Sequence, residues 1–512
     1  MNNPFRRPPK EERIPRPAFG AYKRFLLAGL LIVLMTAATT ATAALLQIKD
    51  VVDILREQPG LALRKGTITA AQAGKPQTLL LLGSDKRFDL RDKGQPARSD
   101  TMMLIRLDPN QAATTLMSIP RDLEVQIPGV RGISKINAAY SIGGADLAAR
   151  TVKELLHIPI NHIININFRG FRRAVDYIGC VYVDVDRRYY HSNAGLPPSL
   201  QYSEINIEPG YQRLCGQDAL AYVRYRHTDS DIVRAARQQD FLSAAKSQVG
   251  QSSILSDLKP LVDIFARNTQ ADSNLKSESG VLRLLKLAAF STGHPVREIH
   301  FPVTYSGPQM QTLTVTPQDA AKAAREFLHG KASTGPRKSG PPALRSKSRR
   351  HHRRHERLTS VPGIVDARQL SENQVAATVA KAQVPFPVYF PTKLTIAGRY
   401  STLGPNPYVY TLRDRANHVH HAYRLVIEEN ALLGQYYGVQ GVDWLTPPIL
   451  SHPNATEHVR GHTYLLYGDG TRLRLVAWRT PKAAYWVSNT LSLDLTNRQM
   501  LAIAESLTRF AK

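Results

Sequence analysis

Two arginines followed by a helix form the part of this sequence best suited to bind a phosphate group. Residues 222–239 read YVRYRHTDSDIVRAARQQ. We expect a strand over residues 221–226, which places Arg224 and Arg226 on the same side because side chains alternate along a strand. The polar turn residues 227–230 then lead into a helix, whose N-terminus favours anions. Since guanidinium groups match phosphate oxygens, these residues together predict a phosphate-binding site.

Polar residues continue along one face of the predicted helix. Asp231, Arg234 and Gln238 follow one another at i, i+3 and i+7, a spacing that brings them to the same face. We expect the N-terminal cap of the helix in the region 229–231. A solvated strand end followed by an ordinary charged helix face fits the same spacing, so spacing alone leaves both interpretations open.

The ends of three predicted strands supply a second group of candidate residues. The apolar runs are TLLLLGSD, which ends at Asp85, DTMMLIRLD, which begins at Asp100, and TTLMSIPRD, which contains Arg121 near its end. In an antiparallel meander the end of one strand lies beside the start of the next. We therefore expect Asp85, Asp100 and Arg121 at one edge of a sheet.

This edge is also a candidate metal site. Neighbouring carboxylates favour a cation between them, and Mg²⁺ suits one or two carboxylates with water and phosphate oxygens completing its coordination. Asp85 and Asp100 are the candidate ligands, and Arg98 is close enough in sequence to reach the same edge. The alternative is that both aspartates point from strand ends into water.

A long apolar run near the N-terminus indicates the compartment. Residues 25–48 contain no charged residue and can cross about 30 Å of hydrocarbon as a helix. The basic residues 1–24 place the N-terminus in the cytoplasm and the bulk of the chain outside, in a single-pass cell-membrane protein. A cleaved signal peptide is the alternative, because residues 41–43 resemble a cleavage site. Outside the cytoplasm, the net charge of +26 has no nucleic acid to bind.

Composition divides the rest of the 512 residues into four parts. Residues 49–77 read as a stalk, and residues 78–329 alternate strands with helices. Residues 330–362 are rich in Pro, Ser and Gly and then in Arg and His, which predicts a basic disordered linker able to meet lipid headgroups or anionic wall polymers. Residues 363–512 predict an α+β accessory domain, whose last helix covers residues 497–510 and which shows no catalytic constellation.

The chain contains two cysteines, which allow one disulfide. Cys180 opens a predicted strand, and Cys215 follows a turn that returns toward it. A Cys180–Cys215 bridge can form outside the cytoplasm, and two separate buried thiols are the alternative.

Five motifs between residues 78 and 245 resemble, in the same order, those of the LytR-CpsA-Psr family. They are LLLGSDKR, RSDTMMLIRLDP, SIPRD, SKINAAYSIGG and ALAYVRYRHTDSDIVRAARQQ. The resemblance implies an α/β fold in which a mixed sheet is flanked by helices in α-β-α layers around an apolar tunnel for a polyprenyl tail. It implies a membrane enzyme that transfers a glycopolymer phosphate from a polyprenyl-pyrophosphate carrier to peptidoglycan with the assistance of Mg²⁺.

The resemblance also implies roles for individual residues. Asp85 and Asp100 match the family's metal-associated aspartates, and Asp231 matches an acidic residue beside its pyrophosphate pocket. The residues that match the pocket itself are Arg98, Arg121, Arg224, Arg226, Arg234 and Gln238. The residues expected to take part in catalysis are Asp100, Arg121, Arg224, Arg226 and Asp231. Cys215 departs from the family pattern, because many relatives carry a small polar residue there.

Two other functions remain open. With water as the acceptor, the same site would make the protein a polyprenyl-pyrophosphate phosphatase. The basic linker and the second domain would instead suit a non-catalytic anchor that binds the wall or regulates other proteins.

Overall fold

The computed structural model describes most of the chain after residue 48. The described residues are 49–50, 52–84, 99–111, 113–197, 201, 203–225, 229–250, 259–291, 294, 296–306, 312–329, 361–379, 384–459 and 461–510. The chain divides into two compact units, Met1–Val51 and Val52–Lys512. The predicted transmembrane helix and nearly all of the predicted linker lie outside the described residues. Within those residues, no helix combines the length and the apolar character needed to cross a membrane.

A six-stranded mixed sheet forms the centre of the N-terminal domain, residues 77–329. In spatial order its strands are β11 (Thr269–Ala271), β6 (His162–Asn167), β1 (Gln77–Ser84), β2 (Ser99–Leu107), β3 (Thr114–Ser118) and β12 (Val296–Ile299). Strands β1, β2 and β3 pair antiparallel as a meander, whereas β6 runs parallel to β1 and β12 runs parallel to β3. The predictions of a mixed sheet and of an early meander are confirmed.

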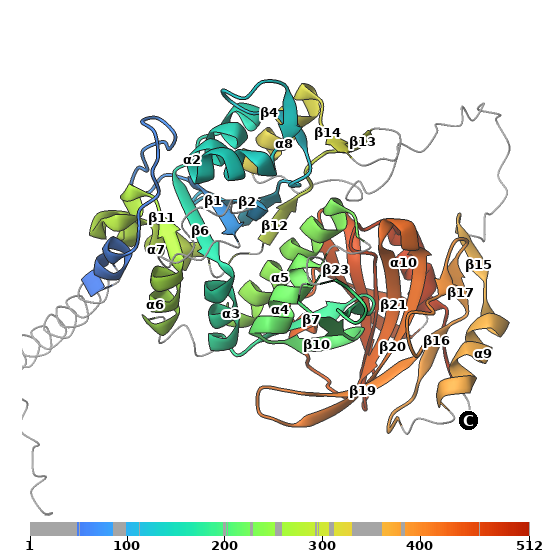
Figure 1. Ribbon diagram of the computed structural model, residues 1–512. Coiled ribbons are helices and arrows are strands. Elements are labelled where there is room, and N and C mark those ends of the chain that lie inside the picture. The colour runs from blue at the N-terminus through green and yellow to red at the C-terminus, as the bar shows by residue number, and fades with distance from the viewer. Residues whose placement is uncertain are drawn as a thin grey trace, which may run out of the picture. The chain divides into compact units, whose positions relative to one another are not determined.

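Helices cover both faces of this sheet (Figure 1). Leu80, Leu82 and Leu104 point to one face and are buried against α2 (Asn137–Leu156) and α8 (Pro317–His329). The opposite face packs against five helices. They are α3 (Phe168–Tyr177), α4 (Gly216–Arg224), α5 (Asp231–Gly250), α6 (Lys259–Asn268) and α7 (Glu278–Ser291). The near-continuous apolar sequences of β1 and β2 follow from this burial on both faces.

Short strand pairs and one 3₁₀ helix complete the described part of this domain. They are β4 (Glu124–Gln126) with β5 (Ile133–Lys135), β7 (Val181–Val185) with β10 (Gly210–Leu214), β8 (Tyr189–His191) with β9 (Ile205–Ile207), β13 (Thr304–Ser306) with β14 (Thr312–Thr314), and the 3₁₀ helix η4 (Ser273–Lys276).

The predicted strand over residues 221–226 is wrong, because the residues up to Arg224 form the last part of helix α4. Asp218 in the first turn and Arg224 in the last turn both complement the helix dipole. The buried ring of Tyr222 packs edge-on against Tyr189. The alternation of side chains that suggested a strand covers only residues 221–226. Over so few residues, tertiary packing decides the secondary structure.

The C-terminal domain, residues 361–510, is built on an eight-stranded antiparallel sheet. Its strands are β18 (Arg399–Tyr400), β19 (Tyr408–Arg413), β20 (Val419–Asn430), β21 (Gln435–Val442), β22 (Ala455–Val459), β23 (His462–Asp469), β24 (Arg472–Arg479) and β25 (Ala484–Ser488). Smaller elements surround the sheet. They are β15 (Ile364–Asp366), α9 (Arg368–Val379), β16 (Tyr389–Pro391), β17 (Lys393–Thr395), η5 (Ala431–Leu433), η6 (Pro448–Leu450), α10 (Asn497–Glu505) and β26 (Leu507–Arg509).

This second domain belongs to the all-β class, so the prediction of an α+β domain is corrected. Its two helices are short and pack at the periphery of the sheet, with Met500 and Ile503 of α10 buried in the same core as the strands. The closing helix was predicted from residue 497 to 510 but ends at Glu505, after which β26 pairs with β16. The side chain of Thr496 caps its N-terminus by accepting a hydrogen bond from the amide of Gln499.

The two domains share a buried interface at β7 and β10. Tyr182 and Tyr211 of these strands enter an apolar cluster with Trp486 of β25. Arg424 of β20 is fully buried and donates to both carboxylate oxygens of Asp184 in β7, at 3.0 and 3.3 Å. A buried guanidinium needs a counterion, so charge pairing as well as apolar packing holds this interface together.

We predict that Asp184→Ala lowers the free energy of unfolding by about 3–5 kcal/mol, because Arg424 then stays buried without its carboxylate. Urea unfolding of the full chain measures the loss. The Asp184→Ala/Arg424→Met double variant is the control and should recover much of the stability, because the buried charge is gone. Equal stability of the single and double variants would contradict this account of the interface.

Candidate functional site

One edge of the central sheet gathers the strand ends that the sequence predicts to carry chemistry. Ser84, the last residue of β1, pairs with Ser99 at the start of β2. After β3, the amide of Ile119 donates to the carbonyl of Met102 at 2.8 Å. Asn167, the last residue of β6, also lies beside Ser84. The backbone therefore brings the end of β1, the start of β2 and the end of β3 to one edge, as the meander predicts.

Several predicted site residues cannot be placed at this edge in full. Asp85, Arg98 and Arg226 lie outside the described residues, and Asp100 is described only as backbone in β2. Their roles, including the binding of Mg²⁺ by Asp85 and Asp100, stay predictions. The remaining predicted residues belong to the loop after β3 and to helices α4 and α5.

The buried carboxylate of Asp231 joins helix α5 to the loop after β3. It forms an ion pair with Arg234 one turn later on the same helix, and one of its oxygens lies 3.9 Å from Nε of Arg121. Its other oxygen accepts a hydrogen bond from the amide of Asp122 at 3.3 Å. The structure therefore brings together Arg121 from the predicted strand ends and Asp231 and Arg234 from the predicted helix face.

Gln238 extends the same face of α5 toward the start of β2. Its side-chain amide donates to the hydroxyl of Thr101 at 3.0 Å and to the carbonyl of Val223 in α4 at 3.1 Å. Asp231, Arg234 and Gln238 are all buried, so the face predicted from their spacing turns inward rather than toward solvent. Sequence reasoning missed Thr101, although it directly follows Asp100.

Arg224 lies at the C-terminal end of α4, beside an aromatic ring. Its guanidinium carbon is 4.0 Å from the centroid of the Phe168 ring, a geometry that favours a cation–π interaction. Phe168 begins α3 directly after β6 and was not predicted as a site residue. Phe168 lies at this edge because β6 is parallel to β1 and the carboxyl ends of parallel strands share an edge.

An apolar cavity of about 370 Å³ extends inward from this edge, between the sheet and helices α3, α4, α5 and α6. Thr101, Asn167, Arg224 and Gln238 are polar residues that line the cavity near the sheet edge. The side chains deeper in the cavity are mainly aliphatic and aromatic. They include Leu81, Met103, Phe171, Val223, Phe241 and Phe265. The cavity is therefore suited to an apolar chain rather than to a polar metabolite.

The charges near the cavity favour an anionic group. Arg224 lines this end of the cavity, and Arg121 and Arg234 lie beside the carboxylate of Asp231 at the start of α5, the helix that also places Gln238 in the cavity lining. Such an arrangement suits a phosphate or diphosphate, because guanidinium groups bind its oxygens in pairs. An amphipathic ligand with an apolar tail and a phosphate head would match both parts of the site.

Comparison with known proteins decides the family. The model of the LytR_cpsA_psr family matches residues 41–326, which is more than half of the chain. This protein belongs to the LytR_cpsA_psr family. The match ends before the C-terminal domain begins, so that domain lies outside the region that defines the family.

Two curated relatives illustrate the similarity. The chain is 35% identical over 205 residues to the polyisoprenyl-teichoic acid–peptidoglycan teichoic acid transferase TagU of Oceanobacillus iheyensis, covering 38% of this chain and 59% of TagU. It is 32% identical over 204 residues to the transferase of the same description, TagT, of Bacillus subtilis, covering 40% of this chain and 62% of TagT. The match thus spans about three fifths of each relative.

A solved structure of a family member is also similar to this chain. The crystal structure of TagV from B. subtilis is 28% identical, with a TM-score of 0.40, and the alignment covers 50% of this chain and 98% of TagV.

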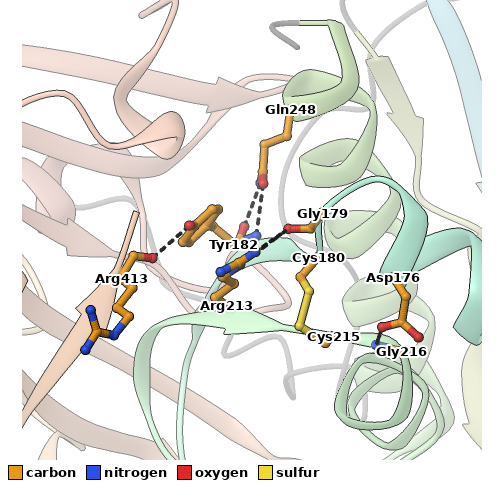
Figure 2. The surroundings of a disulfide bond; sticks show 9 residues. All are labelled: Asp176, Gly179, Cys180, Tyr182, Arg213, Cys215, Gly216, Gln248 and Arg413. Carbon is orange, nitrogen blue, oxygen red and sulfur yellow. Dashed lines mark hydrogen bonds between the residues drawn. A yellow bond between two sulfur atoms is a disulfide. The ribbon is translucent and has the colours of Figure 1, made fainter. Parts of the chain in front are cut away.

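A disulfide fixes the other end of the helix that carries Arg224. Cys180, directly before β7, is bonded to Cys215, the residue before α4, and Figure 2 shows this bridge. Asp176 of α3 also accepts a hydrogen bond from the first amide of α4, that of Gly216, at 2.7 Å. Among the described residues, Asp176 and the two cysteines are the one group with the spacing of a three-ligand metal site, but the bonded sulfurs are not available as ligands.

Lys246 lines the cavity two turns after Gln238 on the same helix. Its stem borders the apolar space, while its amine donates to the hydroxyl of Thr114 at 3.1 Å and to the carbonyl of His294 at 2.6 Å. Burial lowers the pKa of Lys246 to about 8. Sequence reasoning did not select Lys246, although its i+8 spacing from Gln238 places it near the same helix face.

Reduction of the disulfide should destabilise the protein. We predict that Cys180→Ser/Cys215→Ser loses about 3–4 kcal/mol of unfolding free energy, because the bridge closes a loop with a sequence separation of 35. Chemical unfolding with and without reductant measures this loss. In reductant, the unfolding free energy of the wild type should fall to that of the double variant. The unfolding free energy of the double variant should be the same with and without reductant. An unfolding free energy of the wild type that does not change in reductant would contradict the prediction.

Stability should rise with pH through the titration of Lys246. Its folded pKa of about 8 lies below the ordinary value of 10.5, so the folded chain binds fewer protons between these values and the free energy of unfolding increases with pH. We expect about 2 kcal/mol from this group, less than the full pKa shift would give because the amine is partly solvated.

The measurement is the unfolding free energy of the wild type relative to Lys246→Met from pH 7 to 10.5. The difference should change in favour of the wild type as the pH rises, whereas Lys322→Met, which removes an exposed lysine on α8, should show a constant difference. If the difference in unfolding free energy between the wild type and Lys246→Met is also constant with pH, Lys246 is not the group responsible for the change in stability.

Proposed function

We propose that this protein is a membrane-anchored phosphotransferase that moves a glycopolymer phosphate from a polyprenyl-pyrophosphate carrier to peptidoglycan on the outer side of the membrane. The observation that carries the proposal is the apolar cavity that reaches Arg224 near the sheet edge where Arg121 and Arg234 lie beside Asp231. The names of the relatives TagU and TagT support a wall glycopolymer of the teichoic-acid type as the transferred group.

The proposed substrate lies with its tail among the aliphatic and aromatic side chains of the cavity. Its diphosphate then meets Arg224 at the end of α4, with Arg121 and Arg234 beside Asp231. These cations would neutralise the charge that develops on the leaving phosphate as its bond to the transferred phosphorus breaks. Because the donors belong to helices and to a buried loop, they are held in place before the substrate arrives.

In the proposed reaction, a hydroxyl oxygen of peptidoglycan attacks the phosphorus that carries the glycopolymer. The bond from this phosphorus to the bridging oxygen breaks, and polyprenyl monophosphate leaves. The hydroxyl proton must pass to a base. Asp231 is a poor candidate because Arg234 and the amide of Asp122 already donate to or pair with its oxygens. We therefore assign to Asp231 the positioning of the arginines and assign the proton to Asp100, of which one carboxylate oxygen would remain to accept it while the other holds the metal ion.

Mg²⁺ is part of the proposal. Asp85 and Asp100 are the residues that would hold it, and the donor set of two carboxylates suits this ion. When bound, the ion would neutralise charge on phosphate oxygens.

We predict that Arg224→Ala and Arg234→Ala each lower the rate of glycopolymer transfer to isolated peptidoglycan by about 10²-fold, because each removes a cation that stabilises the leaving group. Arg325→Ala is the matched control, since Arg325 is exposed on α8 across the sheet. It should transfer at the wild-type rate. Wild-type rates from both site variants would exclude this site as the phosphate-binding site.

The two alternative functions give different outcomes in the same assay. A phosphatase releases soluble glycopolymer phosphate or inorganic phosphate and joins no polymer to the wall. A non-catalytic anchor shows neither product, and Asp100→Ala in the cell would then leave the wall unchanged.

A further inference from the structure

The C-terminal domain contacts the segment that leads into helix α5. Gly434, which follows η5 at the tip of the β20–β21 hairpin, has a φ of +66°. A Cβ atom at this position would lie 2.7 Å from Oδ1 of Asp229 and 3.7 Å from Val233. Leu491 of the same domain packs against Val233 and Ala236 on α5. The domain thus covers the side of α5 opposite to the cavity.

Asp229 lies two residues before Asp231, and two arginines share its buried carboxylate. Arg187 pairs with one oxygen and Arg237 of α5 pairs with the other, and all three side chains are nearly or fully buried. Two positive charges therefore depend on one carboxylate in a dry environment, with Asp186 as a further buried acid beside Arg187. Rearranging such a network costs a large amount of free energy, because a charge that lost its partner would remain buried without water.

Arg237 connects the network to both helices of the candidate site. Its guanidinium donates to the carbonyls of Tyr222 and Tyr225, at 3.0 and 2.9 Å, which fixes the last turn of α4, where Arg224 lies. Arg237 itself precedes Gln238 on α5. One side chain therefore determines how the end of α4 sits relative to the face of α5 that carries Asp231, Arg234 and Gln238.

The C-terminal domain also covers Arg187. The guanidinium of Arg187 lies between aromatic rings, 4.6 Å from the centroid of Tyr189 and 5.2 Å from that of Tyr436. Tyr436 belongs to β21, two residues after Gly434. The second domain thus excludes water from the network at two points, Arg187 and Asp229.

We propose that the C-terminal domain positions the phosphate-binding side chains, and that Asp229 is the positioning residue through which it acts. The hairpin tip at Gly434 packs against Asp229 and fixes its position. Asp229 forms an ion pair with Arg237 of α5. Arg237 in turn donates hydrogen bonds to the carbonyls at the end of α4 and so joins the two helices. The accessory domain is therefore part of the machinery for the proposed transfer, on which this inference rests, rather than a separate binding module.

The test compares two glycine variants in the full chain. Gly434→Ala and Gly461→Ala both place an alanine in a left-handed conformation, with φ of +66° and +80°, so both carry the same backbone penalty. They differ in surroundings, because the added Cβ meets Asp229 at position 434 and meets nothing within 4 Å at position 461. Gly461→Ala is therefore the matched control for strain.

We expect Gly434→Ala to lower kcat for transfer by about tenfold or more, because small displacements of positioned groups have large effects on rate. KM for the lipid substrate should change by less than about threefold, since the apolar cavity that binds the tail is not altered. Gly461→Ala should keep both constants, and its loss of thermal stability measures the effect of an alanine with positive φ that has no contact to Asp229. Equal kcat values for the two variants would overturn the proposal.

Two further measurements separate this inference from the proposed function. Hydrogen exchange of the amides of residues 231–238 should be faster in Gly434→Ala than in the wild type and Gly461→Ala, whether or not the protein transfers glycopolymer. Asp229→Asn should also lower kcat, whereas Asp184→Asn, which weakens the buried Asp184–Arg424 pair of the same interface, should not. If the wild type does not transfer glycopolymer, the proposed function is refuted but the positioning role of the C-terminal domain is not. If the amides of residues 231–238 exchange at the same rate in Gly434→Ala as in the wild type, the positioning role is refuted.

Discussion

The carboxylate of Asp231 accepts a hydrogen bond from the amide of Asp122, which is 109 residues away in the sequence. The same carboxylate pairs with Arg234 and lies beside Arg121. Because a buried carboxylate requires such partners, the start of α5 must stay against the loop that follows β3. This interaction therefore holds Asp231 and Arg234, from the middle of the chain, beside Arg121 and the end of β3.

The site is amphipathic because two structural constraints meet at this edge. Strands β1 and β2 are apolar on both faces, so the side of the sheet that faces α3 to α6 continues as an apolar cavity wherever side chains do not fill the space. The polar ends of the strands and the ends of α4 and α5 then surround one end of that cavity. A ligand with a hydrocarbon tail and a phosphate head would satisfy both.

Local periodicity predicted much of this arrangement. The meander of β1 to β3 and the shared face of Asp231, Arg234 and Gln238 follow from patterns within a few residues, and the structure has both, whereas the burial of that face comes from tertiary packing. The strand predicted over residues 221–226 failed because buried contacts of Tyr222, and the capping of its last turn by Arg237, favour a helix. Thr101, Phe168 and Lys246 were missed because their places depend on which elements pack together, and a single sequence does not contain that information directly. The accessory domain was assigned to the wrong class because its helices are few and peripheral.

The central claim is that one lipid-linked phosphate group lies at the end of the cavity, among the arginines of the loop after β3, α4 and α5. Native mass spectrometry of the full chain, purified in mild detergent, tests this claim most directly. We predict one bound polyprenyl phosphate or pyrophosphate per chain, which is lost in Leu242→Glu because that change places a charge in the cavity. Binding of phosphorus-free lipids or of ordinary phospholipids in place of polyprenyl phosphates, or equal binding by the variant, would contradict the claim.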